Sequence, residues 1–168
     1  MQKSDYSKGL KVVKIKLVRD GAIGKDRYIT SPQEAVDVMC EELAEYDREL
    51  MCVVNLRSDM SVINMNISSI GNIDSAFASP RDIFKSSILS NAAGILVFHN
   101  HPSGNLKPSK DDYNLTKRLV EAGQLLDIQV VDHIIVSSGP RKGYYSFKER
   151  GELGLGALEA LCRKSYER

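Results

Sequence analysis

Residues 94–112 read GILVFHNHPSGNLKPSKDD, and this stretch contains the features that decide the fold. The apolar run 94–98 is uninterrupted, which is typical of a strand buried on both faces of a sheet. Proline and glycine residues over 102–108 indicate a loop, and Ser109 is a candidate N-cap for the amphipathic stretch that follows. A buried strand, a loop and a helix in this order predict an α/β protein, with His99 and His101 in the loop just after the strand.

Further elements are expected on both sides of this stretch. β-rich runs predict strands over 12–18, 50–56, 62–67, 128–131 and 134–136. Helices are expected to begin at Ser31-Pro32, Ser79-Pro80 and Ser109, to end near Tyr46 in the first case and at Gly123 in the third, and to close the chain over 152–168. The sequence therefore predicts one domain with a mixed α+β sheet flanked by helices.

Composition limits the class of protein. A chain of 168 residues with 42% hydrophobic and 27% charged residues suits one globular domain. The net charge of +1 lacks the basic balance that is usual in dedicated DNA-binding modules. The three cysteines form no CxxC pair, and we find no signal peptide or apolar run long enough to span a bilayer. We expect a cytoplasmic protein that does not associate with membranes.

The pattern His99-x-His101, followed after ten residues by Asp112, supplies two imidazoles and one carboxylate. These are the three protein ligands of an open catalytic zinc site, so a metal hydrolase is the leading hypothesis. The alternatives are imidazoles that bond only to the backbone, and a capping box in which Asp112 serves only the helix start at Ser109. His133 is expected to be a packed core residue, or one that orients a ligand.

The same residues carry a resemblance to a known family. The run 99–104, Pro108-Ser109 and Asp112 resemble the signature of JAMM/MPN (JAB) metalloproteases, and most closely their RadC-like branch. Further segments that resemble this branch are Arg48-Glu49, 69–71, 79–84, 132–136 and 145–147. The resemblance covers about 28–153, which leaves 1–27 as a lead-in with the first strand and 154–168 as a C-terminal helix. It implies a JAB/MPN fold of the cytidine-deaminase-like type.

The resemblance also implies roles for individual residues. His99, His101 and Asp112 would hold Zn²⁺, Ser109 would help to bind the metal water or the developing oxyanion, and an upstream glutamate would be the general acid and base. We assign that glutamate to Glu49, which stands just before the strand 50–56. The alternatives are that Ser109 is only an N-cap and that Glu49 pairs with neighbouring basic residues.

The expected activity is hydrolysis of peptide or isopeptide-like amide bonds, with an unknown peptide or protein as substrate. Two other functions stay open: a DNA-associated repair or recombination accessory protein or nuclease, and a scaffold without turnover. Relatives in this branch typically carry an upstream helical DNA-binding region, for which the residues before Lys11 are too few. The basic residues expected near the site are Arg81, Lys85, Lys107, Lys110, Lys117 and Arg118. The leucines of 152–168 are expected to cover the core or to form the face of a homodimer.

Overall fold

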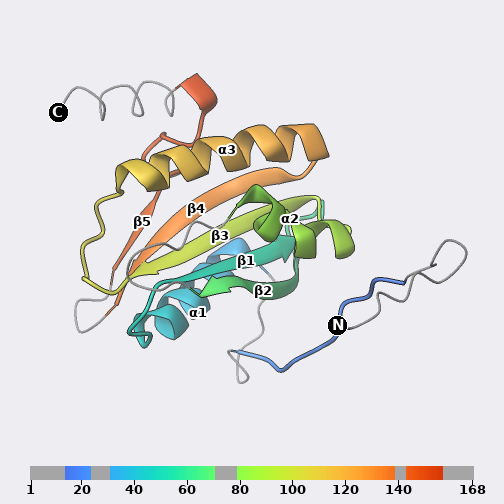
Figure 1. Ribbon diagram of the computed structural model, residues 1–168, viewed down its shortest axis with the longest axis horizontal. Coiled ribbons are helices and arrows are strands. Elements are labelled where there is room, and N and C mark those ends of the chain that lie inside the picture. The colour runs from blue at the N-terminus through green and yellow to red at the C-terminus, as the bar shows by residue number, and fades with distance from the viewer. Residues whose placement is uncertain (1–13, 24–30, 71–78, 139–142, 157–168) are drawn as a thin grey trace, which may run out of the picture.

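Strand β3 lies at the centre of a five-stranded sheet with the strand order β2-β1-β3-β4-β5 (Figure 1). The computed structural model describes residues 14–23, 31–70, 79–138 and 143–156. The strands are β1 (Leu50–Leu56), β2 (Val62–Ile70), β3 (Gly94–His101), β4 (Gln129–Ser137) and β5 (Tyr144–Ser146). The helices are α1 (Pro32–Ala44), α2 (Pro80–Leu89) and α3 (Lys110–Leu126). The predicted mixed sheet with flanking helices is confirmed.

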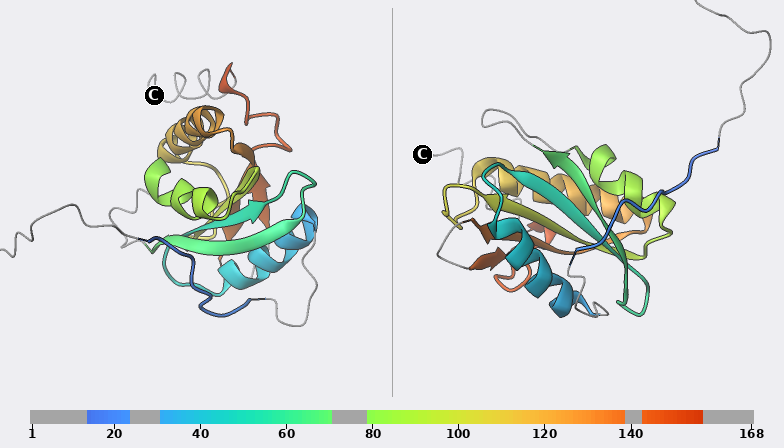
Figure 2. Two further views of the ribbon diagram at one scale, coloured as in Figure 1. Left: turned by 90° about the vertical axis from the view of Figure 1, so that its right-hand side faces the viewer. Right: turned by 90° about the horizontal axis from the view of Figure 1, so that it is seen from below.

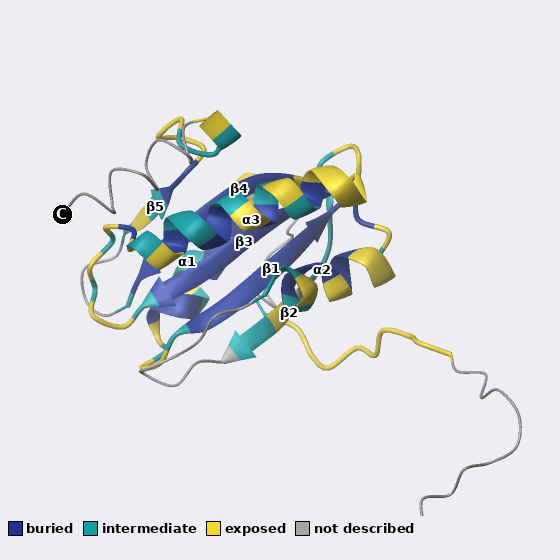
Figure 3. Cartoon of the chain, turned by 45° about the horizontal axis from the view of Figure 1, so that its top comes forward, coloured by how far each residue is buried: buried dark blue, intermediate teal, exposed yellow. Residues whose placement is uncertain are grey.

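The central position of β3 follows from its apolar sequence. It pairs with β1 in antiparallel and with β4 in parallel orientation, so that both backbone edges are satisfied. Helix α3 connects β3 to β4, as a parallel pair requires. Figure 3 shows β3 and β1 buried along almost their whole length.

Helices cover the two faces of the sheet separately. Helix α1 packs on one face and helices α2 and α3 pack on the other, as the left view of Figure 2 shows. Side chains alternate along a strand, so Leu96 and Phe98 join the α1 side, whereas Ile95 and Val97 join the α2 and α3 side. The same alternation sends His99 and His101 toward α3, and Asn100 toward the opposite face.

Each helix begins at the predicted cap. Ser31 accepts a hydrogen bond from Glu34 N and Glu34 accepts one from Ser31 N, which completes a capping box. Ser79 pairs in a similar way with Asp82 at the start of α2. The predicted hairpin of β1 and β2 is also confirmed, with Leu56 paired to Val62 across the turn.

Several predicted boundaries were wrong. His99 and His101 belong to β3 itself rather than to the loop after it, because β3 continues its pairing with β4 as far as His101. The two predicted strand pieces 128–131 and 134–136 are one strand, β4, in which His133 pairs with Val97 of β3. The predictions followed apolar runs only, so they ended each strand at its buried polar residues, His99 in β3 and Asp132 in β4.

Gly123 does not end helix α3, which continues to Leu126 and has a left-handed Asp127 as its C-cap. The lack of a side chain at Gly123 serves packing instead. A Cβ atom there would lie 2.5 Å from Ile128 O and 3.4 Å from the ring of Phe84. The glycine lets the helix approach the beginning of the next segment closely.

The predicted first strand is not present where the structure describes it. Over residues 14–18 the chain pairs with no strand, and Ile15 and Val18 are 73% and 77% exposed. Residues 12 and 13 lie outside the described residues. An alternating pattern alone does not form a strand when no sheet edge pairs with it.

The predicted C-terminal helix is described only at its beginning. Residues 155 and 156 are helical, and 157–168 lie outside the described residues. Among the helices that the structure describes, none combines the length and the apolar character needed to cross a bilayer.

Candidate metal centre

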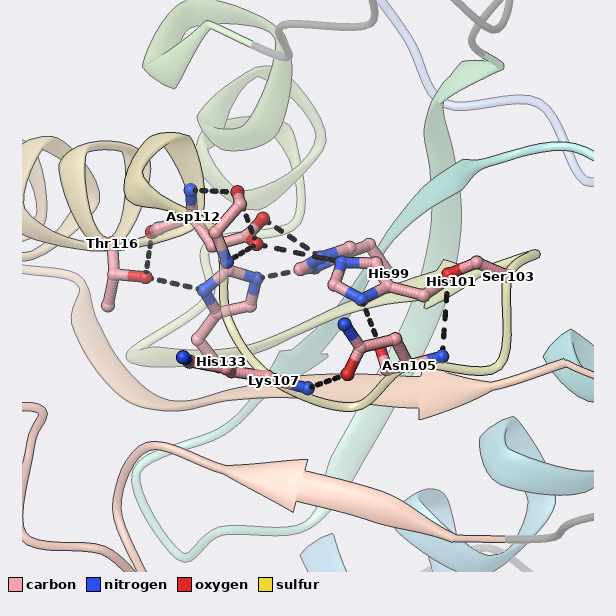
Figure 4. A network of polar contacts seen from close by, with 9 residues as sticks. His99, His101, Ser103, Asn105, Lys107, Asp112, Thr116 and His133 are labelled. Atoms are coloured by element: carbon pink, nitrogen blue, oxygen red, sulfur yellow. Dashed lines mark hydrogen bonds and ion pairs between the residues drawn. The ribbon is translucent and has the colours of Figure 1, made fainter.

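Side chains of His99, His101 and Asp112 converge at the carboxyl end of β3 (Figure 4). His99 Nε2 lies 3.0 Å from His101 Nε2 and 3.0 Å from Asp112 Oδ1. His101 Nε2 lies 3.6 Å from Asp112 Oδ2. One ligand atom from each residue therefore falls within 4.8 Å of the others.

Secondary structure explains this convergence. His99 and His101 are two positions apart on β3 and therefore point to the same face of the sheet. Helix α3 returns across that face and brings Asp112, in its first turn, over the strand end. The side chain of His99 is fully buried, whereas those of His101 and Asp112 are 16% and 10% exposed. Solvent reaches the cluster from the side of His101 and Asp112.

Asp112 divides its two oxygens between two tasks. Its Oδ2 accepts hydrogen bonds from Ser109 N and Ser109 Oγ, both at 2.6 Å, and its own N donates to Ser109 Oγ. This is the capping box of α3. Its Oδ1 faces His99 Nε2. The capping role and the site role are therefore compatible.

The hydrogen bonds of the imidazoles favour a cation between them. Nδ1 of His101 lies 2.5 Å from the carbonyl oxygen of Asn105, which can only accept, so this nitrogen carries the proton. In the neutral ring the lone pair is then on Nε2, which faces His99 and Asp112. Ligands about 2.0–2.1 Å from one tetrahedral zinc ion lie roughly 3.3 Å apart, close to the spacing found here. The residues fit a divalent cation.

Local electrostatics agree with this fit. Burial alone would raise the pKa of Asp112, but the adjacent imidazoles of His101 and His99 and the hydroxyl of Ser109 outweigh it and hold the pKa well below the usual range. Burial opposes charge on His101, yet the contacts with Asp112 and Asn105 and the charge of Glu49 raise its pKa. The site thus holds an ionised carboxylate and attracts positive charge.

Glu49 and Ser109, the other two predicted site residues, lie near this cluster. Met51 pairs with His99 across β1 and β3, and Glu49 stands two residues before Met51, directly before β1. Its negative charge acts on His101. Ser109 is the N-cap of α3, and its hydroxyl donates to Asp112.

The sequence did not predict the partners of three buried polar residues around the cluster, which are His133, Thr116 and Asn100. His133 Nε2 lies 2.9 Å from His99 Nδ1, and Thr116 Oγ1 lies 2.6 Å from His133 Nδ1. Asn100 binds the backbone on both sides of Glu49, since it donates to Arg48 O and accepts from Leu50 N. Complete burial lowers the pKa of His133 to about 3 and keeps its ring neutral. Thr116 was predictable in part, because it lies one helical turn after Asp112.

Comparison with known proteins identifies the family of this chain. A model of the RadC-like JAB domain matches residues 29–152. A UPF0758 protein of Thermotoga maritima is 45% identical over 114 residues, or 68% of this chain and 50% of the relative. UPF0758 proteins of Caldanaerobacter subterraneus and Clostridium acetobutylicum are 38% and 41% identical, over 74% of this chain and 56% and 53% of the relatives.

This chain spans about half the length of the curated relatives it matches. The family match extends over most of the chain, from the approach to α1 to the segment after β5. It includes all three side chains of the candidate metal centre. The chain belongs to the RadC-like JAB domain family.

Proposed function

We propose that this protein is a zinc-dependent hydrolase that cleaves peptide or isopeptide-like amide bonds. The observation that carries the proposal is the convergence of the ring nitrogens of His99 and His101 with the carboxylate of Asp112. Glu49 stands directly before β1, the strand that pairs with β3. Two neutral imidazoles and one carboxylate are the ligand set with which His99, His101 and Asp112 would hold a catalytic zinc ion. Membership in a JAB domain family supports a hydrolase of this kind.

His99, His101 and Asp112 would hold the zinc ion, which when bound would supply the acidity that lets a water ionise near neutral pH. Glu49 takes the proton from the attacking water and later returns it to the leaving amine. Glu49 is partly exposed and stands directly before β1, a position that suits this exchange. Ser109, whose hydroxyl donates to Asp112, is assigned to the oxyanion that would develop at the substrate carbonyl.

The proposal is tested with the zinc-loaded protein on a mixture of bacterial peptides and lysine-linked isopeptides. New amine termini are detected by mass spectrometry. The variant Glu49→Gln removes the base without changing its size, and we expect cleavage to fall about 10²- to 10⁴-fold while zinc stays bound. Glu45→Gln is the matched control, because Glu45 is exposed at the C-cap of α1 on the other side of the sheet.

Two results would overturn the proposal: no new termini with the zinc-loaded wild type, or equal cleavage by wild type and Glu49→Gln. The DNA-directed alternative is tested in parallel with plasmid and short duplexes over a range of salt concentration. Affinity for DNA that depends on phosphate contacts falls steeply with salt. With a net charge of only +1, we expect no such binding.

A further inference from the structure

We propose that His133 and Thr116 are positioning residues that set the tautomer of His99, so that the unprotonated Nε2 of His99 faces the cation. This inference deepens the proposed function and rests on the metal centre assigned there. Neither residue touches the cation position. They act through a chain of hydrogen bonds that starts at the backbone of helix α3 and ends at His99.

The chain of contacts is continuous and short (Figure 4). Thr116 Oγ1 lies 2.6 Å from the carbonyl oxygen of Asp112 and 2.6 Å from His133 Nδ1. His133 Nε2 lies 2.9 Å from His99 Nδ1. Thr116, His133 and His99 are each fully buried, so water does not compete for these contacts.

The backbone carbonyl fixes the direction of every proton in this chain. A carbonyl oxygen only accepts, so the single hydroxyl proton of Thr116 points to Asp112 O. Thr116 Oγ1 must then accept from His133 Nδ1–H. The neutral ring of His133 has its lone pair on Nε2, which accepts from His99 Nδ1–H. His99 is left with a lone pair on Nε2, the atom that faces His101 and Asp112.

The opposite direction would disable the site. If Thr116 donated to His133, then His133 would donate to His99 Nδ1, and the proton of His99 would occupy Nε2. That proton would stand where the cation binds. It would also leave two oxygens 2.6 Å apart, Thr116 Oγ1 and Asp112 O, without a proton between them. The relay therefore selects the form of His99 that is competent to bind metal.

The ring of His133 is held firmly enough to serve this purpose. Phe147 stacks on it with an interplanar angle of 8° and a centroid distance of 5.0 Å. Phe147 N donates to His133 O, so the segment after β5 holds both the ring and the backbone of His133. Partners that orient a metal-binding histidine typically change metal affinity 10- to 100-fold when they are removed.

Two variants of Thr116 separate this role from simple packing. Thr116→Val keeps the shape of the side chain but removes the hydroxyl, whereas Thr116→Ser keeps the hydroxyl but removes a buried methyl group. We expect zinc affinity, measured by competition with a chelating dye, to fall about 10- to 100-fold in Thr116→Val and to stay near the wild-type value in Thr116→Ser. A packing role predicts the reverse order, which would overturn the inference.

A second readout does not need the metal. Nitrogen-15 NMR of the metal-free protein reports which ring nitrogen of His133 carries the proton. We expect Nδ1–H in the wild type and in Thr116→Ser, and Nε2–H in Thr116→Val. An Nε2–H signal for His133 in the wild type would overturn the inference, even if Thr116→Val failed to fold.

These results are distinguishable from failure of the proposed function. If wild-type protein binds no zinc, the metal centre is wrong. If wild type and Thr116→Val bind zinc equally, the centre stands and the relay is wrong. The comparison of cleavage by wild type and Glu49→Gln does not test the relay, because Glu49 precedes β1 and is not one of the hydrogen-bonded residues of the relay.

Discussion

Asp112 is the residue in which the local helix signal and the metal signal meet. Ser109-x-x-Asp112 predicts a capping box, and His99-x-His101-x10-Asp112 predicts a ligand set. A carboxylate has two oxygens, and in this structure Oδ2 serves the cap and lies 3.6 Å from His101 Nε2, whereas Oδ1 faces His99. Because the cap needs only one oxygen acceptor, a variant that keeps one oxygen separates the cap from the carboxylate charge of the site.

Asp112→Asn keeps an oxygen for Ser109 but replaces the other by an amide that cannot ligate a cation. Asp112→Ala removes both. We expect both variants to lose zinc affinity, and Asp112→Ala alone to lose about 1 kcal/mol more in the free energy of unfolding of the metal-free protein. Dye competition and urea denaturation measure the two effects. Wild-type zinc affinity in Asp112→Asn would contradict the assignment of Oδ1.

The two described cysteines are predicted to be inert at neutral pH. Burial raises the pKa of Cys40 and of Cys52 to about 12, with a smaller effect from nearby carboxylates. The reactive thiolate therefore becomes abundant only as the pH approaches that value, far above the usual range near 8.5. We expect slow alkylation by iodoacetamide at pH 8 in the folded protein and fast alkylation in urea, followed for each cysteine by mass spectrometry. Equal rates in both states would disprove this.

At the scale of elements, Asn100 connects β3 to the segment that carries Glu49. Its side chain donates to Arg48 O at 3.0 Å and to Ser138 Oγ at 2.9 Å, and accepts from Leu50 N at 2.8 Å. Asn100 is fully buried on the face opposite to His99 and His101. Its position between the two histidines thus aligns the start of β1 with the end of β3.

Asn100→Ala leaves the amide of Leu50 and the carbonyl of Arg48 without these partners. Buried polar groups that lose a partner cost about 1–3 kcal/mol each, so we expect a loss of that order in the free energy of unfolding. Ser138→Ala is the control, because it removes one contact of Asn100 and leaves those on either side of Glu49. Urea denaturation that ranked the control as the more destabilised variant would argue against the role of Asn100.

For the whole molecule, local patterns predicted the elements and tertiary pairing determined their limits. The helix starts at Ser31, Ser79 and Ser109 follow from capping chemistry within four residues, and they were predicted correctly. The strand end at His101 depends on pairing with β4, and the continuation of α3 past Gly123 depends on contacts with Phe84 and Ile128. Such limits are not encoded within a single segment.

The site divides in the same way. The spacing of His99, His101 and Asp112 was sufficient to expect a cluster, because one strand and the next helix turn carry all three. The links to His133 and Asn100 join residues 34, 50 and 52 positions apart, and they exist only after the sheet has formed. Chemistry within one βα unit was predictable, whereas the contacts that orient it arise from the register of neighbouring strands.

A bound cation at this site would join β3 to α3, so zinc should stabilise the whole domain. A ligand that binds only the folded state adds about 2.7 kcal/mol when its free concentration is 100 times its dissociation constant. We expect thermal unfolding of the wild type to shift upward with zinc and to return to the metal-free value when a chelator is added. His99→Ala, which removes a buried candidate ligand on β3, should show no zinc-dependent shift. An equal shift in both proteins would mean that the stabilising ion binds elsewhere, because its binding would then not depend on His99.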